Sequence, residues 1–372
     1  MSLDRRTVLT GAAGCLLLGT LGARRSAARD ATGPAFLSCG AERDGRYFVA
    51  GLGGNGRLGF RQALPARGHG VAIHPSRAQG VVFARRPGSF ALVLDTLAGT
   101  VLHGIEAAPG RHFYGHGIFA AEGRLLFAGE NDYAAGRGVL GVYDAGEAYR
   151  RIGEVPSHGV GPHDLRLMPD GRTLVVANGG IRTHPDYGRA KLNLASMAPN
   201  LTYLEAASGR LLEAVRLPQA LHQLSIRHLD VTAEGRVAIA MQYEGDRRDR
   251  VPLLGLHERG GEIRLLEAPA PIARRMRHYT GSVAFDASGA FLAVSSPRGH
   301  VVTLWDARRG AYLGHIEARD ASGLAPSGKA GAFLVTGGDG SIQEADARDG
   351  TARPVARADG RVRWDNHLCR AG

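Results

Sequence analysis

The sequence of 372 residues lacks several features that would indicate a known chemistry. It contains no C-x-x-C-H, H-E-x-x-H or G-x-S-x-G motif, which argues against a covalently bound c-type haem, a zincin protease and an α/β-hydrolase. Beyond the N-terminal region, no apolar run approaches the length of a membrane span. Lysine is scarce as well: Lys191 and Lys329 are the two lysines, so arginine carries nearly all of the positive charge.

Glycine is abundant, with 54 residues, while aromatic residues make up 6% of the sequence. The glycines follow no G-X-Y period, which excludes a collagen helix and indicates many tight turns. Hydrophobic residues at 44% and charged residues at 22% are sufficient for a buried core. We therefore expect an ordered chain of many short strands.

The N-terminal residues 1–28 have the pattern of a twin-arginine (Tat) signal peptide. Arg5 and Arg6 precede an apolar run that extends to about Leu21, and small residues around Ala28 offer a cleavage site. An N-terminal membrane anchor is the alternative. We expect a periplasmic protein with no membrane contact after cleavage and, despite the formal net charge of +11, no nucleic-acid partner. Residues 29–34 form the expected linker.

Residues 35–372 predict an all-β fold, a single seven-bladed β-propeller. A short element precedes the first strand of each expected blade, 42 to 65 residues apart. It occurs at His69-Gly70, His116-Gly117, His163-Asp164, His228-Leu229, Gly281-Ser282, Gly323-Leu324 and Asn366-His367. Seven blades give about 48 residues each, which is typical of four-stranded blades. Six or eight blades stay open.

The two ends of the propeller domain are expected to share the closing blade. A C-terminal strand near Leu368–Arg370 would be innermost, beside three N-terminal runs. These runs lie at Phe36–Gly40, Tyr47–Leu52 and Arg57–Gln62. This arrangement places Cys39 and Cys369 on neighbouring strands, where they form a disulfide or remain two buried thiols.

Four histidines occupy equivalent positions in consecutive blades and are candidate metal ligands: His69, His116, His163 and His228. Pseudo-rotational symmetry would aim them at the propeller axis, where neutral imidazoles suit iron, copper or zinc. Asp164 and Asp230 are candidates to orient the rings. The alternative is that each histidine only forms hydrogen bonds within its own blade.

The loops expected at the same mouth of the axial channel are rich in arginine, whose guanidinium forks bind carboxylates and phosphates. An anionic ligand such as a haem propionate, a carboxylate chelate or an acidic protein surface would fit; ion pairing within the protein is the alternative. The candidate ligand-binding residues are Arg85, Arg86, Arg111, Glu130, Asp132, His184, Arg189, Lys191, Arg227, Gln242, Arg298 and Asn366. Several lie in the insertion Gly179–Asn200, which is long enough to form a binding loop.

A series of longer motifs resembles the exported bacterial family called domain of unknown function fifteen-thirteen. They lie at Arg85–Asp95, Arg111–Gly117, Glu130–Asp144, Gly159–Leu167, Val176–Leu201, Leu224–Leu229, Gln242–Gly245, Tyr279–Val283, Ser296–Gly299 and Trp364–Leu368. The resemblance implies a seven-bladed YVTN/quinoprotein-like propeller. It also implies an iron-uptake context, with an imelysin-type or di-haem periplasmic protein as a partner, but no reaction.

Three functions follow from these observations. The first is a periplasmic binding or accessory protein for iron acquisition, which holds a metal, a haem-like or anionic ligand or a partner at one channel mouth. The second is a metal-dependent hydrolase or oxidoreductase with a carboxylate such as Glu130 or Asp132 as its base. The third is a scaffold for protein interactions. The sequence leaves open which metal, if any, is bound, and the oligomeric state.

Overall fold

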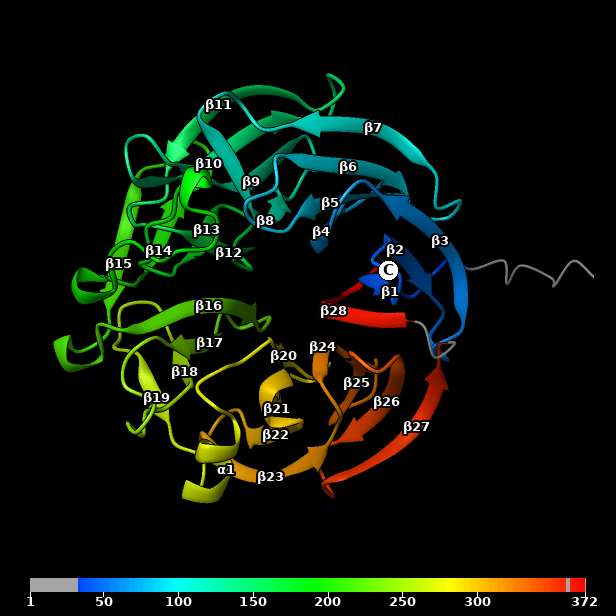
Figure 1. Cartoon of the computed structure of the whole chain (residues 1–372), viewed down its shortest axis with the longest axis vertical. Coiled ribbons are helices and arrows are strands. Elements are labelled where there is room, and N and C mark those ends of the chain that lie inside the picture. The colour runs from blue at the N-terminus through cyan, green and yellow to red at the C-terminus, as the bar shows by residue number, and fades with distance from the viewer. Residues whose placement is uncertain (1–32, 359–361, 372) are drawn as a thin grey trace, which may run out of the picture. The chain divides into compact units, whose positions relative to one another are not determined.

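The computed structural model describes residues 33–358 and 362–371, which form seven four-stranded antiparallel sheets around one axis (Figure 1). The expected signal peptide and most of the linker lie outside the described residues. Within the described part of the chain, no helix is long and apolar enough to cross a membrane. The predicted all-β, seven-bladed propeller is confirmed.

The strands follow the chain from the axis outward in six of the blades. The second blade comprises β4 (Gly68–Ile73), β5 (Gln79–Ala84), β6 (Phe90–Asp95) and β7 (Val101–Glu106). The third comprises β8 (Arg111–Phe119), β9 (Leu125–Asp132), β10 (Arg137–Asp144) and β11 (Arg150–Pro156). The fourth comprises β12 (Pro162–Leu167), β13 (Thr173–Asn178), β14 (Asn200–Glu205) and β15 (Leu211–Arg216).

The remaining blades repeat this arrangement. The fifth comprises β16 (Leu224–Val231), β17 (Val237–Tyr243), β18 (Leu254–His257) and β19 (Arg264–Leu266). The sixth comprises β20 (Ser282–Phe285), β21 (Phe291–Ser296), β22 (Val301–Asp306) and β23 (Ala311–Glu317). The seventh comprises β24 (Ala321–Pro326), β25 (Ala332–Gly337), β26 (Ser341–Asp346) and β27 (Thr351–Arg357). Short helices lie in the connections: η1 (Pro185–Tyr187), η2 (Leu194–Ser196), η3 (Gln219–Leu221), α1 (Ala270–Arg275) and η4 (Pro297–Gly299).

The first blade closes the ring with both ends of the propeller. The C-terminal strand β28 (Val362–Arg370) is innermost, followed by β1 (Phe36–Glu42), β2 (Tyr47–Leu52) and β3 (Leu58–Leu64), as the sequence predicts. Cys39 lies on β1 and Cys369 on the adjacent β28, where it pairs with Leu37. Both cysteines are free thiols in this structure, so the disulfide stays a prediction.

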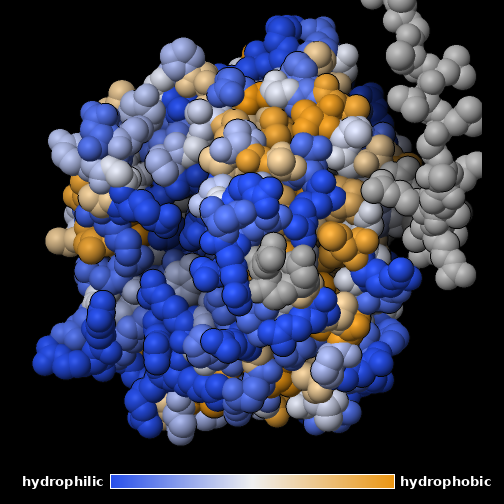
Figure 2. Space-filling model, turned by 45° about the vertical axis from the view of Figure 1, so that its right-hand side comes forward, coloured by the Kyte–Doolittle hydropathy of each residue, from blue (hydrophilic) through white to orange (hydrophobic). Residues whose placement is uncertain are grey.

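Burial follows the distance of each strand from the axis. Inner strands such as β13 are buried along their whole length, whereas the outermost β7 is exposed at five of six positions. Apolar side chains fill the spaces between neighbouring blades, where Trp305 and Tyr203 are among the largest buried residues. Figure 2 shows one face of the surface, on which hydrophilic residues dominate and apolar residues form smaller patches.

Carboxylates at the inner strands link consecutive blades. Each accepts a hydrogen bond from a backbone N–H in the next blade along the chain. The pairs are Asp164 with Leu229 (3.0 Å), Asp230 with Phe285 (2.7 Å) and Asp286 with Gly331 (2.8 Å). Hydrogen bonds to ionised carboxylates are stronger than bonds between neutral groups, so these links stabilise the contact between neighbouring blades.

Replacing Trp364 tests how strongly the closing strand β28 stabilises the ring. Trp364 is buried and packs edge-on against Phe48 of β2 with ring centroids 5.9 Å apart. We expect Trp364→Ala to lower the free energy of unfolding by about 3–5 kcal/mol, measured by chemical denaturation. Leu97→Ala, at a position that is 58% exposed, is the control and should change it by less than about 0.5 kcal/mol. Equal effects would show that strand closure contributes little.

Candidate functional site

Five histidines converge at the axis, one from each of five neighbouring blades. We call them the hub histidines: His69 of β4, His116 of β8, His163 of β12, His228 of β16 and His367 of β28. The other two innermost strands carry no histidine at the corresponding positions; their anchor residues are Gly281 and Gly323. The structure thus brings together the four histidines that the sequence singled out and adds a fifth.

A β-bulge at or beside each hub histidine explains its direction. Each of the five histidine-bearing innermost strands shifts its register with the next strand of its blade at or beside the hub histidine. A bulge adds an unpaired residue, bends the strand and re-aims a side chain that would otherwise alternate between the sheet faces. On β12, for example, the shift between Pro162 and Asp164 leaves His163 unpaired. The local backbone therefore turns these imidazoles into the channel.

Two glycines give the imidazoles the space to meet. A Cβ on Gly70 would lie 2.6 Å from the carbonyl oxygen of Gly115 and 2.7 Å from Nδ1 of His116. A Cβ on Gly115 would lie 2.6 Å from Cδ2 of His69, and Gly115 has a φ of +106° that disfavours other residues. Any larger residue here would push the rings apart.

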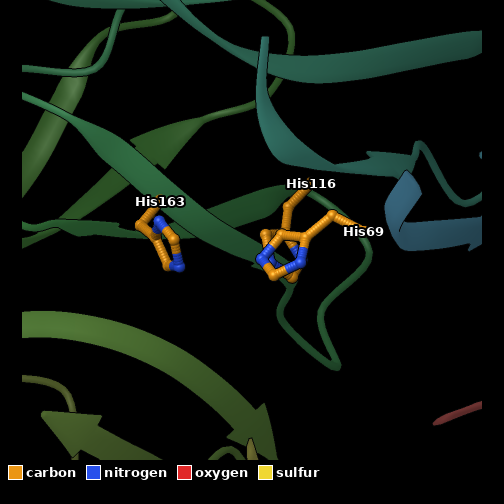
Figure 3. Close-up of side chains that lie close together, drawn as sticks. All are labelled: His69, His116 and His163. Atoms are coloured by element: carbon orange, nitrogen blue, oxygen red, sulfur yellow. The ribbon is translucent and has the colours of Figure 1, made fainter. Parts of the chain in front are cut away.

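The hub has the dimensions of a metal site. Ring centroids of contacting hub histidines are 4.5 to 6.5 Å apart, and imidazoles bound to one tetrahedral ion would be about 5 Å apart. The ligand nitrogens of His69, His116 and His163 lie within 4.8 Å of one another, and so do those of His116, His228 and His367. Figure 3 shows the first of these groups, in which the rings of His69 and His116 overlap in the view and His163 lies to one side.

One nitrogen pair already has the spacing of two ligands. Nε2 of His69 and Nε2 of His367 are 3.3 Å apart and share a hydrogen bond in this structure; two nitrogens bound tetrahedrally at about 2.1 Å would be about 3.4 Å apart. Other hub nitrogens are buried without any hydrogen-bond partner: Nε2 of His116 and both ring nitrogens of His228. Buried polar atoms normally have partners, so these nitrogens fit a group that the protein itself does not supply.

The hub imidazoles are neutral near pH 7. Burial lowers the pKa of His69, His116, His163, His228 and His367. Repulsion from neighbouring arginines and from one another adds to the effect at the last four. A metal ion requires the unprotonated ring nitrogen, so these surroundings prepare the residues to act as ligands.

Asp365 orients His69. Its carboxylate accepts a hydrogen bond from Nδ1 of His69 at 3.1 Å and from Nε of Arg67 at 2.6 Å. Burial alone would raise the pKa of Asp365, but the His69 hydrogen bond and the Arg67 charge hold it far below its ordinary value. With Nδ1 engaged, Nε2 of His69 directs its lone pair into the hub, as ligand histidines do in metal sites.

An ion pair between the buried Asp164 and the partly buried Arg166 lies beside the hub. Arg166 donates to Asp164 at 2.6 Å, and Asp164 lies 3.4 Å from Nδ1 of His116. Burial raises the pKa of Asp164 and Asp230, while the charge of Arg166 opposes that shift at both. The sequence suggested both aspartates as ring-orienting groups. Asp164 does lie beside a hub ring, whereas Asp230 accepts the backbone N–H of Phe285.

A cavity of about 1240 Å³ opens onto the hub, and we call it the basic funnel. His69, His163 and His228 line it together with many cations. Eight of the candidate ligand-binding residues are on its wall: Arg85, Arg86, Arg189, Lys191, Arg227, Gln242, Arg298 and Asn366. The insertion Gly179–Asn200 thus contributes two of the eight, Arg189 and Lys191, to the site.

Four candidate residues are not brought to the funnel: Arg111, Glu130, Asp132 and His184. Glu130 pairs with Arg151 at 2.8 Å, and Asp132 pairs with both Arg111 and Arg137. His184 contacts Tyr133 instead, with ring centroids 5.0 Å apart. The expected carboxylate bases are therefore committed to ion pairs on the third blade.

The predicted site residues omit His367 and Tyr114. The repeat marks the pair Asn366-His367, of which the sequence prediction includes Asn366 as a ligand-binding candidate. A bulge on β28 makes His367 the hub residue, which the sequence alone does not display. Tyr114 lines the funnel from inside the bulge of β8, and no repeated pattern marks it.

Comparison with known proteins gives a family and a fold. A family model described as "Protein of unknown function (DUF1513)" matches residues 62–371. No curated protein matches the sequence. Among solved structures, hydrazine synthase from Kuenenia stuttgartiensis is 15% identical and has a TM-score of 0.60, with 92% of this chain and 100% of that chain covered. At this identity the likeness shows the propeller fold alone.

Two glycine substitutions separate crowding at the hub from backbone strain. Gly115 and Gly110 both have positive φ, but a Cβ on Gly110 would meet nothing within 4 Å. We expect Gly115→Ala to lower the free energy of unfolding by about 1–3 kcal/mol more than Gly110→Ala, because only the first pushes on His69. Chemical denaturation of both variants gives this difference. No difference would contradict the close packing at the hub.

Proposed function

Since the chain belongs to the DUF1513 family of proteins of unknown function, we propose its function from its own residues. The hub histidines bind a transition-metal ion at the base of the basic funnel. The observation that carries this proposal is the set of buried, neutral imidazole nitrogens without partners, of which Nε2 of His116 is the central one. His116 belongs to both groups of three ligands.

The imidazole ligands limit which metal ions the site would bind. Neutral imidazoles favour zinc, copper, iron and nickel, whereas calcium and magnesium prefer oxygen ligands. Neither cysteine is among the three-ligand groups found in the described residues, which makes an iron–sulfur centre a poor fit. Iron, copper and zinc are the metals we propose, and the iron-uptake setting implied by the family resemblance favours testing iron first.

The funnel supports access to the bound ion. Three hub histidines line the cavity, so a ligand that enters from this mouth reaches the imidazole nitrogens directly. A bound metal would supply Lewis-acid chemistry there. The protein's own residues position the ligands. Asp365 keeps the proton of His69 on Nδ1, which leaves Nε2 free to bind, and Arg166 with Asp164 packs beside His116.

We propose a periplasmic location for this site, because residues 1–28 have the pattern of a twin-arginine signal. That route exports proteins already folded, so the metal would enter either before export or in the periplasm. A role in iron acquisition follows from the family resemblance, with an imelysin-type or di-haem protein as the proposed partner.

Metal content tests the proposal. Purified protein is dialysed separately against iron, copper and zinc salts at about micromolar free metal, and bound metal is measured by elemental analysis. We expect at least one tightly bound ion per chain and its loss in His116→Ala, since that change removes a ligand of both three-histidine groups.

His112→Ala is the matched control. His112 lies on the same strand β8 and is also buried, but it contacts Asn131 rather than the hub. This variant should keep the metal. The proposal is wrong if the wild-type protein takes up none of these metals, or if His112→Ala and His116→Ala lose metal equally while both remain folded.

A further inference from the structure

We propose that the funnel contains a built site for a small, multiply charged oxyanion, formed by Arg86, Arg227 and Tyr114. The anion would be one that presents phosphate or carboxylate oxygens. The anion site stands on its own contacts; only the idea that its ligand also reaches the metal rests on the proposed function. Its three residues come from three different blades, so the fold alone assembles them.

Arg86 carries a guanidinium that has no close partner in the part of the chain that the structure describes. It lies in the connection between β5 and β6, is partly buried, and makes no side-chain hydrogen bond or ion pair with any described residue. Burial, with the nearby charge of Arg227, lowers the pKa of Arg86 to about 10. A charge taken out of water without a counter-ion is costly, so this position favours binding of an anion.

Arg227 is more deeply buried, and its nearest carboxylate contact is long. Its Nη2 lies 3.8 Å from Glu244, and its Nε is buried with no hydrogen-bond partner. Lys191 already pairs with the same Glu244. Arg227 therefore retains unused donor capacity that faces the cavity.

Tyr114 supplies a third unused donor. Its hydroxyl is buried and has no hydrogen-bond partner among the described residues. The guanidinium groups of Arg86 and Arg227 lie close enough to interact with it electrostatically. A phenol is protonated at neutral pH because its ordinary pKa is about 10. A neutral phenol that donates beside two guanidinium forks matches an anion with several oxygen acceptors.

The basic funnel carries a large net positive charge, from which we infer that its ligand has more than one negative charge. Its lining cations are Arg85, Arg86, Arg189, Lys191, Arg227, Arg247, Arg248, Arg250, Arg274, Arg277 and Arg298. The carboxylates that line it are Glu244 and Asp249. This excess of positive charge attracts anions into the cavity and disfavours metal cations unless an anion accompanies them.

The site also lies next to the hub. Nη1 of Arg227 is 3.5 Å from Nδ1 of His163, so an oxyanion held by this guanidinium is within reach of the hub histidines. A second oxygen of the same ligand could then complete the coordination of a bound metal. The substrate class we assign to the funnel is therefore a small oxyanion that binds arginine and metal together.

Anion binding to metal-free protein tests the inference. Protein freed of metal by chelation is titrated calorimetrically with inorganic phosphate, and separately with succinate, at low ionic strength. We expect saturable binding at one site. Arg86→Gln should weaken it about tenfold or more, because a charge-assisted pair is lost. Tyr114→Phe should weaken it several-fold, since it removes only one hydroxyl donor.

Two further variants keep the test decisive. Arg247→Gln removes the same charge from another part of the funnel wall and should change the affinity less than about twofold. Arg86→Lys keeps the charge but loses the fork, and should fall between wild type and Arg86→Gln. Thermal unfolding checks that each variant is folded.

Several outcomes would overturn the inference. Equal losses in Arg86→Gln and Arg247→Gln would mean diffuse attraction rather than a site, and absence of phosphate and succinate binding would exclude the site. These results do not depend on the metal. If the wild-type protein binds phosphate but takes up no metal, the oxyanion site stands and the proposed metal function fails. If it binds metal but no oxyanion, the reverse holds.

Discussion

Close approach of the innermost strands is the constraint on which the rest of this structure depends. At the axis, a Cβ on Gly70 would lie 2.6 Å from the backbone of Gly115, so neighbouring blades touch almost backbone to backbone. Side chains that point toward the axis from these strands therefore contact one another. With a bulge at or beside each histidine, five blades place an imidazole in this shared space. The hub is thus a consequence of ring closure.

The charges around the hub are paired on the side of Arg166 and less closely paired on the side of the basic funnel. Beside the hub, Arg166 pairs with Asp164, and Asp164 and Asp230 link the blades by accepting backbone N–H groups. Toward the funnel, Arg86 and Arg227 carry charges that the protein leaves without close carboxylate partners. The charge of Arg166 is thus compensated by a close carboxylate, whereas the charges of Arg86 and Arg227 in the cavity are not. Uncompensated charge in a cavity is where an external ligand contributes most.

The histidines and the arginines differ in how well the sequence predicted them. His69, His116 and His163 could be found because they repeat at blade spacing, and a repeat places equivalent residues at equivalent radii. Arginines and carboxylates in loops have no such period. Glu130 therefore looked like a candidate at the mouth, although it pairs with Arg151 on its own blade. Which partner a charged loop residue finds depends on the length of its side chain and on the charges near it in the folded protein. A sequence pattern shows neither.

By itself, the sequence predicted the propeller, favoured seven blades over six or eight, and predicted the shared closing blade and the positions of the inner strands, because turn signals and apolar alternation are local and recur with the blade period. Only the tertiary structure decided that His367 joins the hub and that Asp365 orients His69. It also decided that Tyr114 and Arg227 lie beside Arg86, whose guanidinium has no close partner among the described residues. These relations join residues from different blades. They depend on bulges and on the packing of whole sheets, which no single segment of sequence encodes.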